Sequence, residues 1–429
     1  MRRIARAVLV GVAVAGLAGC WPYPGHDANR TAFNDLETRI TPANVSRLTD
    51  AWTVTEDVPG PRREVADPVV SHRGVHAVYG GCLIATYRPS DGSRRWLRIP
   101  NPSLCSEGRS AHQYSPAFAV GEQVRFGAWG LMSGPGGDTF LPGGGTFDAA
   151  TGAAVEPGVS DRILAGVRGG FVVSTRPRFR ADGVALENAS IVVEPLEGDG
   201  PTVKTDTLGG GLPVLGDHAV FHTGPGTLAT APGDPAAGEG VRAFSRTQTT
   251  SRCGGMTCPL WATRIDGNGS TPVLSPDQST VYVTTATGRL YALDAATGAV
   301  QWTFTFTDSS IWAPPALAKG VLYVVTLDGT VSALDAEACR AGACSMLWSG
   351  STGTRSSVQP AVAGGVVFTG DDDGFVRAFD AAGCGSQFCP RLWQAALPSA
   401  VTGAPAISNG QLYVGTSDGH LIAYQLAPS

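Results

Sequence analysis

The sequence predicts an all-β fold, a β-propeller of small antiparallel sheets, and three observations support this. Gly and Pro, which both interrupt helices, account for 57 and 30 of the 429 residues. Charged residues make up only 16% of the chain, whereas the hydrophobic fraction of 43% is ordinary for a globular protein. A chain of this length is too large for one compact core, and its sequence repeats itself. Disorder, a coiled coil and a long helical array are therefore excluded.

The C-terminal half contains four copies of one unit, with a period of about 45 residues that is typical of propellers and solenoids. Each copy opens with Pro, which is tolerated at the first residue of a strand. A strand rich in β-branched and aromatic residues follows, and then a Gly turn that suits a hairpin. The turn glycines are Gly288, Gly329, Gly374 and Gly419. A third strand and a Trp-containing fourth strand would complete a four-stranded blade.

Strand-opening positions recur along the whole chain and predict eight such blades. They lie at Pro68, Pro116, Leu164, Pro213, Pro272, Pro315, Pro360 and Pro405. The last copy stops at Ser429 without a Trp strand, whereas the segment around Trp52 is a Trp strand that no blade precedes. We therefore expect this N-terminal strand to complete the last blade and to close the ring, which hides an exposed sheet edge. Seven blades, with the weakly repetitive middle merged, are the alternative.

The clearest repeat motifs are Ala292–Trp302, Ala333–Trp348 and Ala378–Trp393, with weaker copies at 86–96 and 147–152. They resemble the pyrroloquinoline-quinone (PQQ)-like repeat of the quinoprotein alcohol dehydrogenase-like superfamily, whose pattern is roughly A-x-D-x-x-T-G-x-x-x-W. In that family the Trp packs between neighbouring blades, a use that fits the large area an aromatic ring buries. The resemblance gives this role to Trp52, Trp96, Trp261, Trp302, Trp348 and Trp393.

The first 19 residues have the features of a secretory signal. Three Arg residues precede about thirteen apolar residues, which are too few to span a bilayer of about 30 Å. The stretch ends in Leu17–Cys20, which resembles the lipobox of bacterial lipoproteins, where the signal is cleaved before the Cys and its thiol is acylated. A plain secretory signal with a chance Cys is the alternative. We expect a signal peptide over 1–19, a tether and entry segment over 20–47, and one propeller domain over 48–429.

Eight cysteines remain after Cys20, an even number that suits disulfides in an oxidising compartment. Three pairs share the spacing C-x4-C, and two further cysteines are left to pair by elimination. Zinc is the competing interpretation, but the pairs are far apart and no His lies within them. The expected pairs are Cys253 with Cys258, Cys339 with Cys344, Cys384 with Cys389, and Cys82 with Cys105.

Residues 21–52 also resemble the entry segment of quinoprotein dehydrogenases, although a segment that only wraps the ring before joining it would look the same. Membership of that enzyme family would imply PQQ and a calcium ion held by Glu, Asn and Asp near the axis, and commonly a vicinal Cys-Cys pair. The sequence contains no Cys-Cys dipeptide, and Gly80-Gly81-Cys82 offers one cysteine only. It also lacks a C-x-x-C-H haem attachment motif. No catalytic residue is predicted, and no cofactor is expected outside this alternative.

Other candidate sites are weaker. Asp371–Gly374 could suggest calcium, but it occupies the Gly turn of its repeat and lacks the later Glu of an EF-hand loop. His218 and His222 would share one face of a strand, where half-buried strand residues are more common than metal ligands. The stretch 134–145 is rich in Gly, and without a following helix with Lys and Ser or Thr we expect a flexible loop there. Long loops such as 223–240 are possible recognition elements.

The sequence therefore favours a non-catalytic binding or scaffold module, anchored to the extracytoplasmic side of a cell membrane through lipidated Cys20. It resembles the propeller lipoprotein of the outer-membrane β-barrel assembly machinery, which implies a protein or small-ligand partner on one face. A net charge of −5 without a large basic patch makes nucleic acid an unsuitable partner, and we expect a monomer. A PQQ-dependent alcohol or sugar dehydrogenase is the alternative function, and a glycan-binding or glycan-cleaving propeller is a third.

Overall fold

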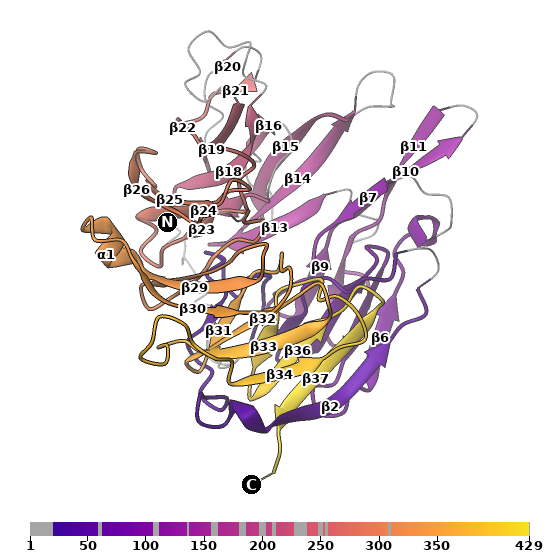
Figure 1. Ribbon diagram of the computed structural model, residues 1–429. Helices are drawn as coiled ribbons and strands as arrows, with labels where there is room; N and C mark the ends of the chain where they lie inside the picture. Colours follow the sequence, from indigo (N-terminus) through magenta and orange to yellow (C-terminus); the bar gives the residue numbers. More distant parts are fainter. Residues whose placement is uncertain are drawn as a thin grey trace, which may run out of the picture.

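The computed structural model describes residues 20–428 except for 59–61, 106–110, 135–136, 156–161, 180–185, 197–202, 208–211, 227–237, 248–251, 254–255 and 308–309. The expected signal peptide, 1–19, lies outside the described residues. Small, mainly four-stranded antiparallel sheets form an eight-bladed propeller, so the prediction of eight blades is confirmed (Figure 1). The innermost strand of each blade begins within two residues of the opening position that the sequence predicts.

Every regular blade is an up-and-down meander of strands A, B, C and D, from the axis outward. In blade 6 the A-to-B turn at 319–320 and the C-to-D connection at 336–345 lie at one end of the sheet. The B-to-C turn at 326–329 and the connection to blade 7 at 352–360 lie at the other end. We call the end with the A-to-B turns and C-to-D connections the CD face, and the opposite end the BC face.

The blades have the following strands, in the order A to D. Blade 1 contains β3 (Val69–Ser71), β4 (Gly74–Tyr79), β5 (Leu83–Tyr87) and β6 (Arg94–Arg98); blade 3 contains β13 (Ile163–Arg168), β14 (Phe171–Phe179), β15 (Leu186–Pro195) and β16 (Val203–Thr207); blade 4 contains β17 (Val214–Leu215), β18 (Ala219–Gly226), β19 (Gly238–Ser245) and β22 (Trp261–Arg264). Blade 5 contains β23 (Val273–Leu274), β24 (Thr280–Thr284), β25 (Arg289–Asp294) and β26 (Val300–Thr305); blade 6 contains β27 (Ala316–Ala318), β28 (Val321–Val325), β29 (Thr330–Asp335) and β30 (Met346–Ser351); blade 7 contains β31 (Ala361–Ala363), β32 (Val366–Gly370), β33 (Phe375–Asp380) and β34 (Trp393–Ala396).

Blade 2 is irregular. Its sheet consists of β8 (Phe118–Val120), β9 (Gln123–Phe126) and β12 (Gly145–Asp148), and the middle strands continue into a second sheet made of β7 (Ala111–Tyr114), β10 (Ala128–Gly134) and β11 (Gly137–Pro142). The prediction of a flexible loop at 134–145 is therefore wrong for the described part. Most of this part forms strand β11, which pairs with β10 and leads into β12. The chain bends at Gly127, where a Cβ atom would lie 1.4 Å from the Arg162 carbonyl oxygen. The short elements η2 (Pro102–Cys105), β20 (Arg252–Cys253) and β21 (Met256–Thr257) lie in connections.

The N-terminal strand closes the ring. Blade 8 takes β35 (Ala406–Ser408), β36 (Gln411–Gly415) and β37 (His420–Leu426) from the C-terminus, and β2 (Leu48–Thr55) from the N-terminus as strand D. Figure 1 shows β2, in indigo, alongside β37, in yellow. Trp52 pairs with Ala423 across this ladder, and its ring lies 5.8 Å from that of Tyr413. The predicted closure is thus confirmed.

Trp side chains lock most junctions between blades, because each indole inserts against the next blade and donates its N–H to a carbonyl there. The donor and acceptor pairs are Trp52 with Pro89, Trp96 with Ala149, Trp261 with Ala295, Trp348 with Ala381, and Trp393 with Leu48, at 2.8 to 3.1 Å. Burial of such a ring together with its N–H bond stabilises the contact. Trp302 is buried as well, but its N–H has no partner in the described structure.

The exception at Trp302 follows from the cystine loop that it faces. In blade 6, the residues after Asp335 form the short helix α1 (Ala336–Arg340), whose first turn is capped by the Asp335 carboxylate. Helix formation directs the Ala336 carbonyl along the helix, away from an indole N–H. In blade 7 the equivalent loop contains Gly383 and Gly385 at φ of 82° and 77°, so it cannot be helical there. Its Ala381 carbonyl remains free to accept from Trp348.

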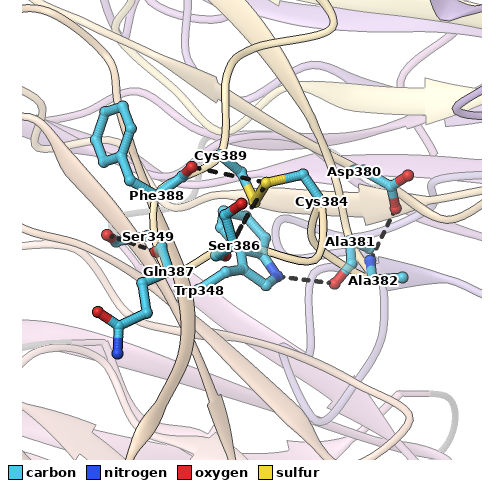
Figure 2. The surroundings of a disulfide bond; sticks show 10 residues. All are labelled: Trp348, Ser349, Asp380, Ala381, Ala382, Cys384, Ser386, Gln387, Phe388 and Cys389. Carbon is cyan, nitrogen blue, oxygen red and sulfur yellow. Dashed lines mark hydrogen bonds between the residues drawn. A yellow bond between two sulfur atoms is a disulfide. The ribbon is translucent and has the colours of Figure 1, made fainter.

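Three of the four expected disulfides are present in the described residues: Cys82–Cys105, Cys339–Cys344 and Cys384–Cys389. Cys258 is also disulfide-bonded, whereas the side chain of its expected partner Cys253 lies outside the described side chains. Figure 2 shows the Cys384–Cys389 loop beside Trp348. The short C-x4-C bridges shape the C-to-D connections of their blades, which is the local role expected of small loops.

Candidate functional site

The axis of the propeller is occupied by the chain's own N-terminal segment, residues 20–34. Its last part, β1 (Phe33–Asn34), runs parallel to β31 as a fifth strand of blade 7. Before that, the segment crosses the ring and bonds to the innermost strands of seven of the eight blades. Its partners, in blade order, are Val70 for Trp21, Ala119 for Pro22, Ala165 for Arg30, Leu274 for Asn29, Leu317 for Thr31, Val362 for Ala32 and Ile407 for Asn34.

This segment passes through the centre of the ring, so the interpretation that it only wraps the ring before joining it is wrong. Residues 35–47, including the 3-10 turn η1 (Val45–Arg47), then run beneath blades 7 and 8 at the CD face. There the Glu37 carboxylate accepts from the Gly410 amide in an A-to-B turn, at 2.8 Å. Each innermost strand other than β31 pairs with a neighbouring strand on one side only, so its other backbone groups face the axis, and the segment supplies hydrogen-bond partners for these groups.

Two charged side chains lie near the axis, of which Arg30 is buried and Asp67 is half-buried. Arg30 lies within the segment, and its guanidinium donates to the Ala165 carbonyl oxygen; burial lowers its pKa to about 10, against the attraction of Asp67. Asp67 precedes β3, and its carboxylate accepts from the Ala404 amide at 2.9 Å. Burial raises the pKa of Asp67 to about 6, while the Ala404 amide and Arg30 oppose the increase. Polar groups therefore lie near the axis, and these two side chains form hydrogen bonds with other groups of the protein.

A shallow depression of about 510 Å³ lies on the BC face where blade 4 connects to blade 5. Within it, the Asp266 carboxylate accepts from the Tyr291 hydroxyl at 2.6 Å and pairs with Arg289 at 3.1 Å. Burial raises the pKa of Glu239, and the exposed Arg264 also lines the depression. Charges of both signs therefore line this depression, which suits a small polar group of a ligand or partner.

The weaker candidates from the sequence have structural roles. Asp371 is fully buried, forms an ion pair with Arg377 and accepts from the Phe375 amide, so it holds its turn rather than a metal. His218 is exposed in a turn before β18, whereas His222 is buried within that strand. The expectation that both lie on one strand is thus wrong. In the described part of the chain, no group of three or more His, Cys, Asp or Glu side chains is placed to hold a metal.

Cys20, the expected lipid attachment site, is the first described residue. It is a free cysteine with 9% of its surface exposed, and burial raises the pKa of its thiol. Among the residues that the structure describes, no helix has the length and apolar character needed to span a bilayer.

Comparisons with known proteins agree with the repeat pattern. Residues 258–384 and 345–427 match the model of the family described as outer membrane protein assembly factor BamB. These two overlapping matches contain blades 5 to 7 and the three C-terminal strands of blade 8, where the Trp and Gly motifs are most regular. No curated protein matches the sequence.

Solved structures of two kinds are similar to the chain. The quinohemoprotein alcohol dehydrogenase from Comamonas testosteroni is 15% identical, with a TM-score of 0.65 over 97% of this chain and 82% of that one. A europium-containing methanol dehydrogenase is 13% identical, with a TM-score of 0.63 over 95% of this chain and 98% of that one. BamB from Moraxella catarrhalis is 17% identical, with a TM-score of 0.56 over 88% of this chain and 99% of that one.

Identities this low establish the fold and leave the activity open, because one fold carries many functions. The chain is a β-propeller of PQQ-like repeats whose C-terminal blades match the BamB family model.

Proposed function

We propose that the protein is a lipid-anchored, extracytoplasmic propeller that acts as a non-catalytic binding or scaffold module of the cell envelope. The observation that carries this proposal is the occupied axis. Segment 20–34 bonds to seven innermost strands, so the chain itself satisfies the backbone groups that face this part of the axis.

The donor groups near the axis also argue against a quinone and calcium centre. Such a centre needs several oxygen donors converging on one ion. Here the Asn34 amide donates to Ile407 and accepts from Leu36, and the Asp67 carboxylate accepts from Ala404. Each of these groups is already bonded within the protein, and they do not fit the set of Glu, Asn and Asp ligands that the dehydrogenase resemblance implies.

The BC face supplies a surface for partner binding. Trp312, in the connection between blades 5 and 6, is 60% exposed there, and the depression around Asp266 lies at the preceding connection. Trp, Tyr and Arg are enriched among the residues that contribute most of the binding energy at protein interfaces. Because the scaffold is rigid, binding at this face would require little ordering of the protein.

The lipid anchor is tested by Cys20→Ser in the full-length chain, expressed in a bacterial host. We expect the native protein in the membrane fraction, with acyl mass on Cys20, and the variant released into the soluble fraction. Several acyl chains on one residue bind a bilayer far more firmly than the protein surface alone. Equal membrane association of the two proteins, with no acyl mass, would contradict the anchor.

The dehydrogenase alternative is tested by mixing the purified protein with PQQ and calcium chloride. The proposal predicts no saturable change in PQQ absorbance and no reduction of an electron-accepting dye by alcohols or sugars. Saturable binding accompanied by substrate-dependent dye reduction would overturn the non-catalytic assignment.

A further inference from the structure

The exposed hydrophobic side chains gather at one end of the propeller. In the described part of the chain, eight large hydrophobic side chains are exposed, and seven of them lie at the CD face. They belong to C-to-D connections, to the first residues of D strands, or to the segment between β1 and β2. These seven are Leu36, Val155, Leu260, Val300, Met346, Leu347 and Phe388. The eighth, Trp312, lies on the BC face.

These residues follow the circumference of the ring rather than one blade. They come from blades 2, 4, 5, 6 and 7, and Leu36 adds a position beneath blades 7 and 8. Single exposed apolar residues are normal on protein surfaces. Their restriction to one end of the ring, around much of its rim, calls for a partner that is broad, flat and apolar.

Phe388 is held in its exposed position by the rigid cystine loop. The Ser349 amide of β30 donates to the Gln387 carbonyl, and the Cys389 amide donates to the Ser349 carbonyl, both at 2.7 Å. The Cys384–Cys389 disulfide closes the same loop, and Figure 2 shows the Phe388 ring pointing away from Trp348. Phe388 is 61% exposed. Two backbone hydrogen bonds and a disulfide therefore hold an apolar ring in a position where it faces the solvent.

The expected lipid anchor leaves the ring at this same end. Trp21 pairs antiparallel with Val70 in the innermost strand of blade 1, and this strand leads toward the A-to-B turn at 72–73. The residue that precedes Trp21 therefore lies toward that turn, which places Cys20 at the CD face near the axis. Lipid chains attached there would enter a bilayer at the centre of the ring of exposed side chains.

We propose that the CD face rests on the lipid bilayer, with Cys20 at its centre and the seven apolar side chains inserted among the lipids around it. This inference rests on the proposed lipidation of Cys20. A tether alone would leave the propeller free to tumble, whereas a second set of contacts fixes its orientation and directs the BC face, with Trp312, away from the membrane. Anchoring through two signals is also firmer than through one.

Apolar insertion, rather than charge, should govern this contact. Charged side chains of both signs lie at the CD face. Arg73 pairs with Glu122 at 2.6 Å and Arg168 with Asp217 at 3.2 Å, and the exposed Lys319 and Arg391 are matched in number by the exposed carboxylates of Asp91 and Glu337. Positive charge is therefore not in excess on this face, which gives it little net attraction for anionic headgroups. We expect binding to neutral lipid that depends only weakly on salt.

The test uses the lipidated full-length protein on phosphatidylcholine vesicles whose acyl chains carry bromine, a quencher of Trp fluorescence. Phe388→Trp and Leu36→Trp place reporters at two separate positions of the CD face. Both native residues are more than half exposed, so the substitutions should not disturb packing. We expect the brominated lipid to quench most of the fluorescence that each substitution adds, while iodide in the water quenches little of it.

The control is Trp312→Phe, which removes the exposed Trp of the BC face. The difference in fluorescence between the native protein and Trp312→Phe is the emission of Trp312. Iodide should quench this emission, whereas brominated lipid should leave it unchanged. If iodide quenches the two reporters on vesicles as strongly as it quenches Trp312, the CD face does not lie on the bilayer and the proposal is overturned. That face would then be open to a protein partner.

Failure of the anchor can be distinguished from failure of the surface. Mass spectrometry of the same preparation shows whether Cys20 carries acyl chains. If it does not, the unacylated protein is floated with neutral vesicles. The double variant Leu36→Ser, Phe388→Ser should then bind the vesicles at least about tenfold more weakly, since burial of each large apolar side chain contributes about a tenfold factor or more. Recovery equal to that of Trp312→Ser would overturn the surface proposal.

Discussion

Trp302 and Trp348 occupy the same position in adjacent blades but differ in one hydrogen bond. The Trp348 indole donates to Ala381 at 3.1 Å, whereas the buried Trp302 indole N–H has no partner. Trp348→Phe should therefore destabilise the protein by about 1 kcal/mol more than Trp302→Phe, because the two substitutions remove similar ring volume and only one removes a bond. Urea unfolding measures the difference. If the two variants lose the same free energy of unfolding, the indole hydrogen bond does not stabilise the contact between blades 6 and 7.

The half-buried Asp67 predicts a particular pH dependence of stability. Burial raises its pKa from about 4 in the unfolded chain to about 6 in the folded protein. Between these values the folded state holds a proton that the unfolded state has released, so this residue lowers stability as pH rises through that window. Asp67→Asn keeps an oxygen that can accept from the Ala404 amide, and it removes the titration.

The prediction concerns the difference between the native protein and Asp67→Asn, since exposed carboxylates titrate in both. The gain in stability of the variant should be small at pH 4 and should grow as the pH reaches 6, with little further change to pH 8. Thermal unfolding at these pH values measures it. A gain that is constant with pH would mean that Asp67 titrates normally.

At the scale of single elements, the Gly in four C-to-D connections makes room for the Trp of the preceding blade; these are Gly92, Gly152, Gly298 and Gly383. Gly298 has φ of 75°, and a Cβ atom there would lie 2.4 Å from the Trp261 ring. Gly320 has a similar φ of 81°, with nothing within 4 Å of its Cβ position. Gly298→Ala and Gly320→Ala should each lower the free energy of unfolding by about 1 kcal/mol through backbone strain. Gly298→Ala should lower it by about 1 to 3 kcal/mol more, because the added methyl group overpacks against Trp261.

Chemical denaturation of Gly298→Ala and Gly320→Ala separates these two contributions. The matched φ values mean that their difference reports the contact with Trp261 alone. A difference near zero would show that the junction can shift to accommodate a methyl group, and that the Gly is present only for its backbone conformation.

The connections between strands show which elements the sequence can specify. The same C-x4-C spacing folds as a helix in blade 6 and as a turn in blade 7. The neighbouring residues decide this: Asp335 caps a run of good helix formers, whereas Gly383 and Gly385 flank Cys384. The spacing of the cysteines was enough to predict both disulfides. It did not predict that Trp348 has a hydrogen-bond acceptor and Trp302 has none, because this difference depends on whether the loop forms a helix.

Strand positions were predictable at the scale of the whole molecule because Pro openings, Gly turns and Trp closures mark most blades. Blade 3, which opens at Leu164 and contains no Trp, is an exception. The closure of blade 8 was predictable by the same argument, since a Trp strand without a blade was left at the N-terminus. The segment through the axis was not predictable. Residues 20–34 bond chiefly through their backbone, and they include left-handed residues such as Arg30 and Ala32, so no periodic side-chain pattern reveals their path.

The candidate site was less predictable than the fold for a related reason. Asp67 and Arg30 are distant in sequence and carry no motif, and only the ring brings both to the axis. The apolar CD face is assembled from single residues of five blades and the entry segment, each ordinary by itself. Only the common orientation of the C-to-D connections shows that they share a surface.

Hydrogen exchange in β37 tests the central claim, that the N-terminal strand completes the ring, most directly. Strand β37 lies between β36 and β2, so nearly every backbone amide from His420 to Leu426 should be protected in the native protein. Residue-resolved exchange measures each amide. Rapid exchange at alternate residues, with slow exchange at those bonded to β36, would show β37 to be an open edge and would contradict the closure by β2.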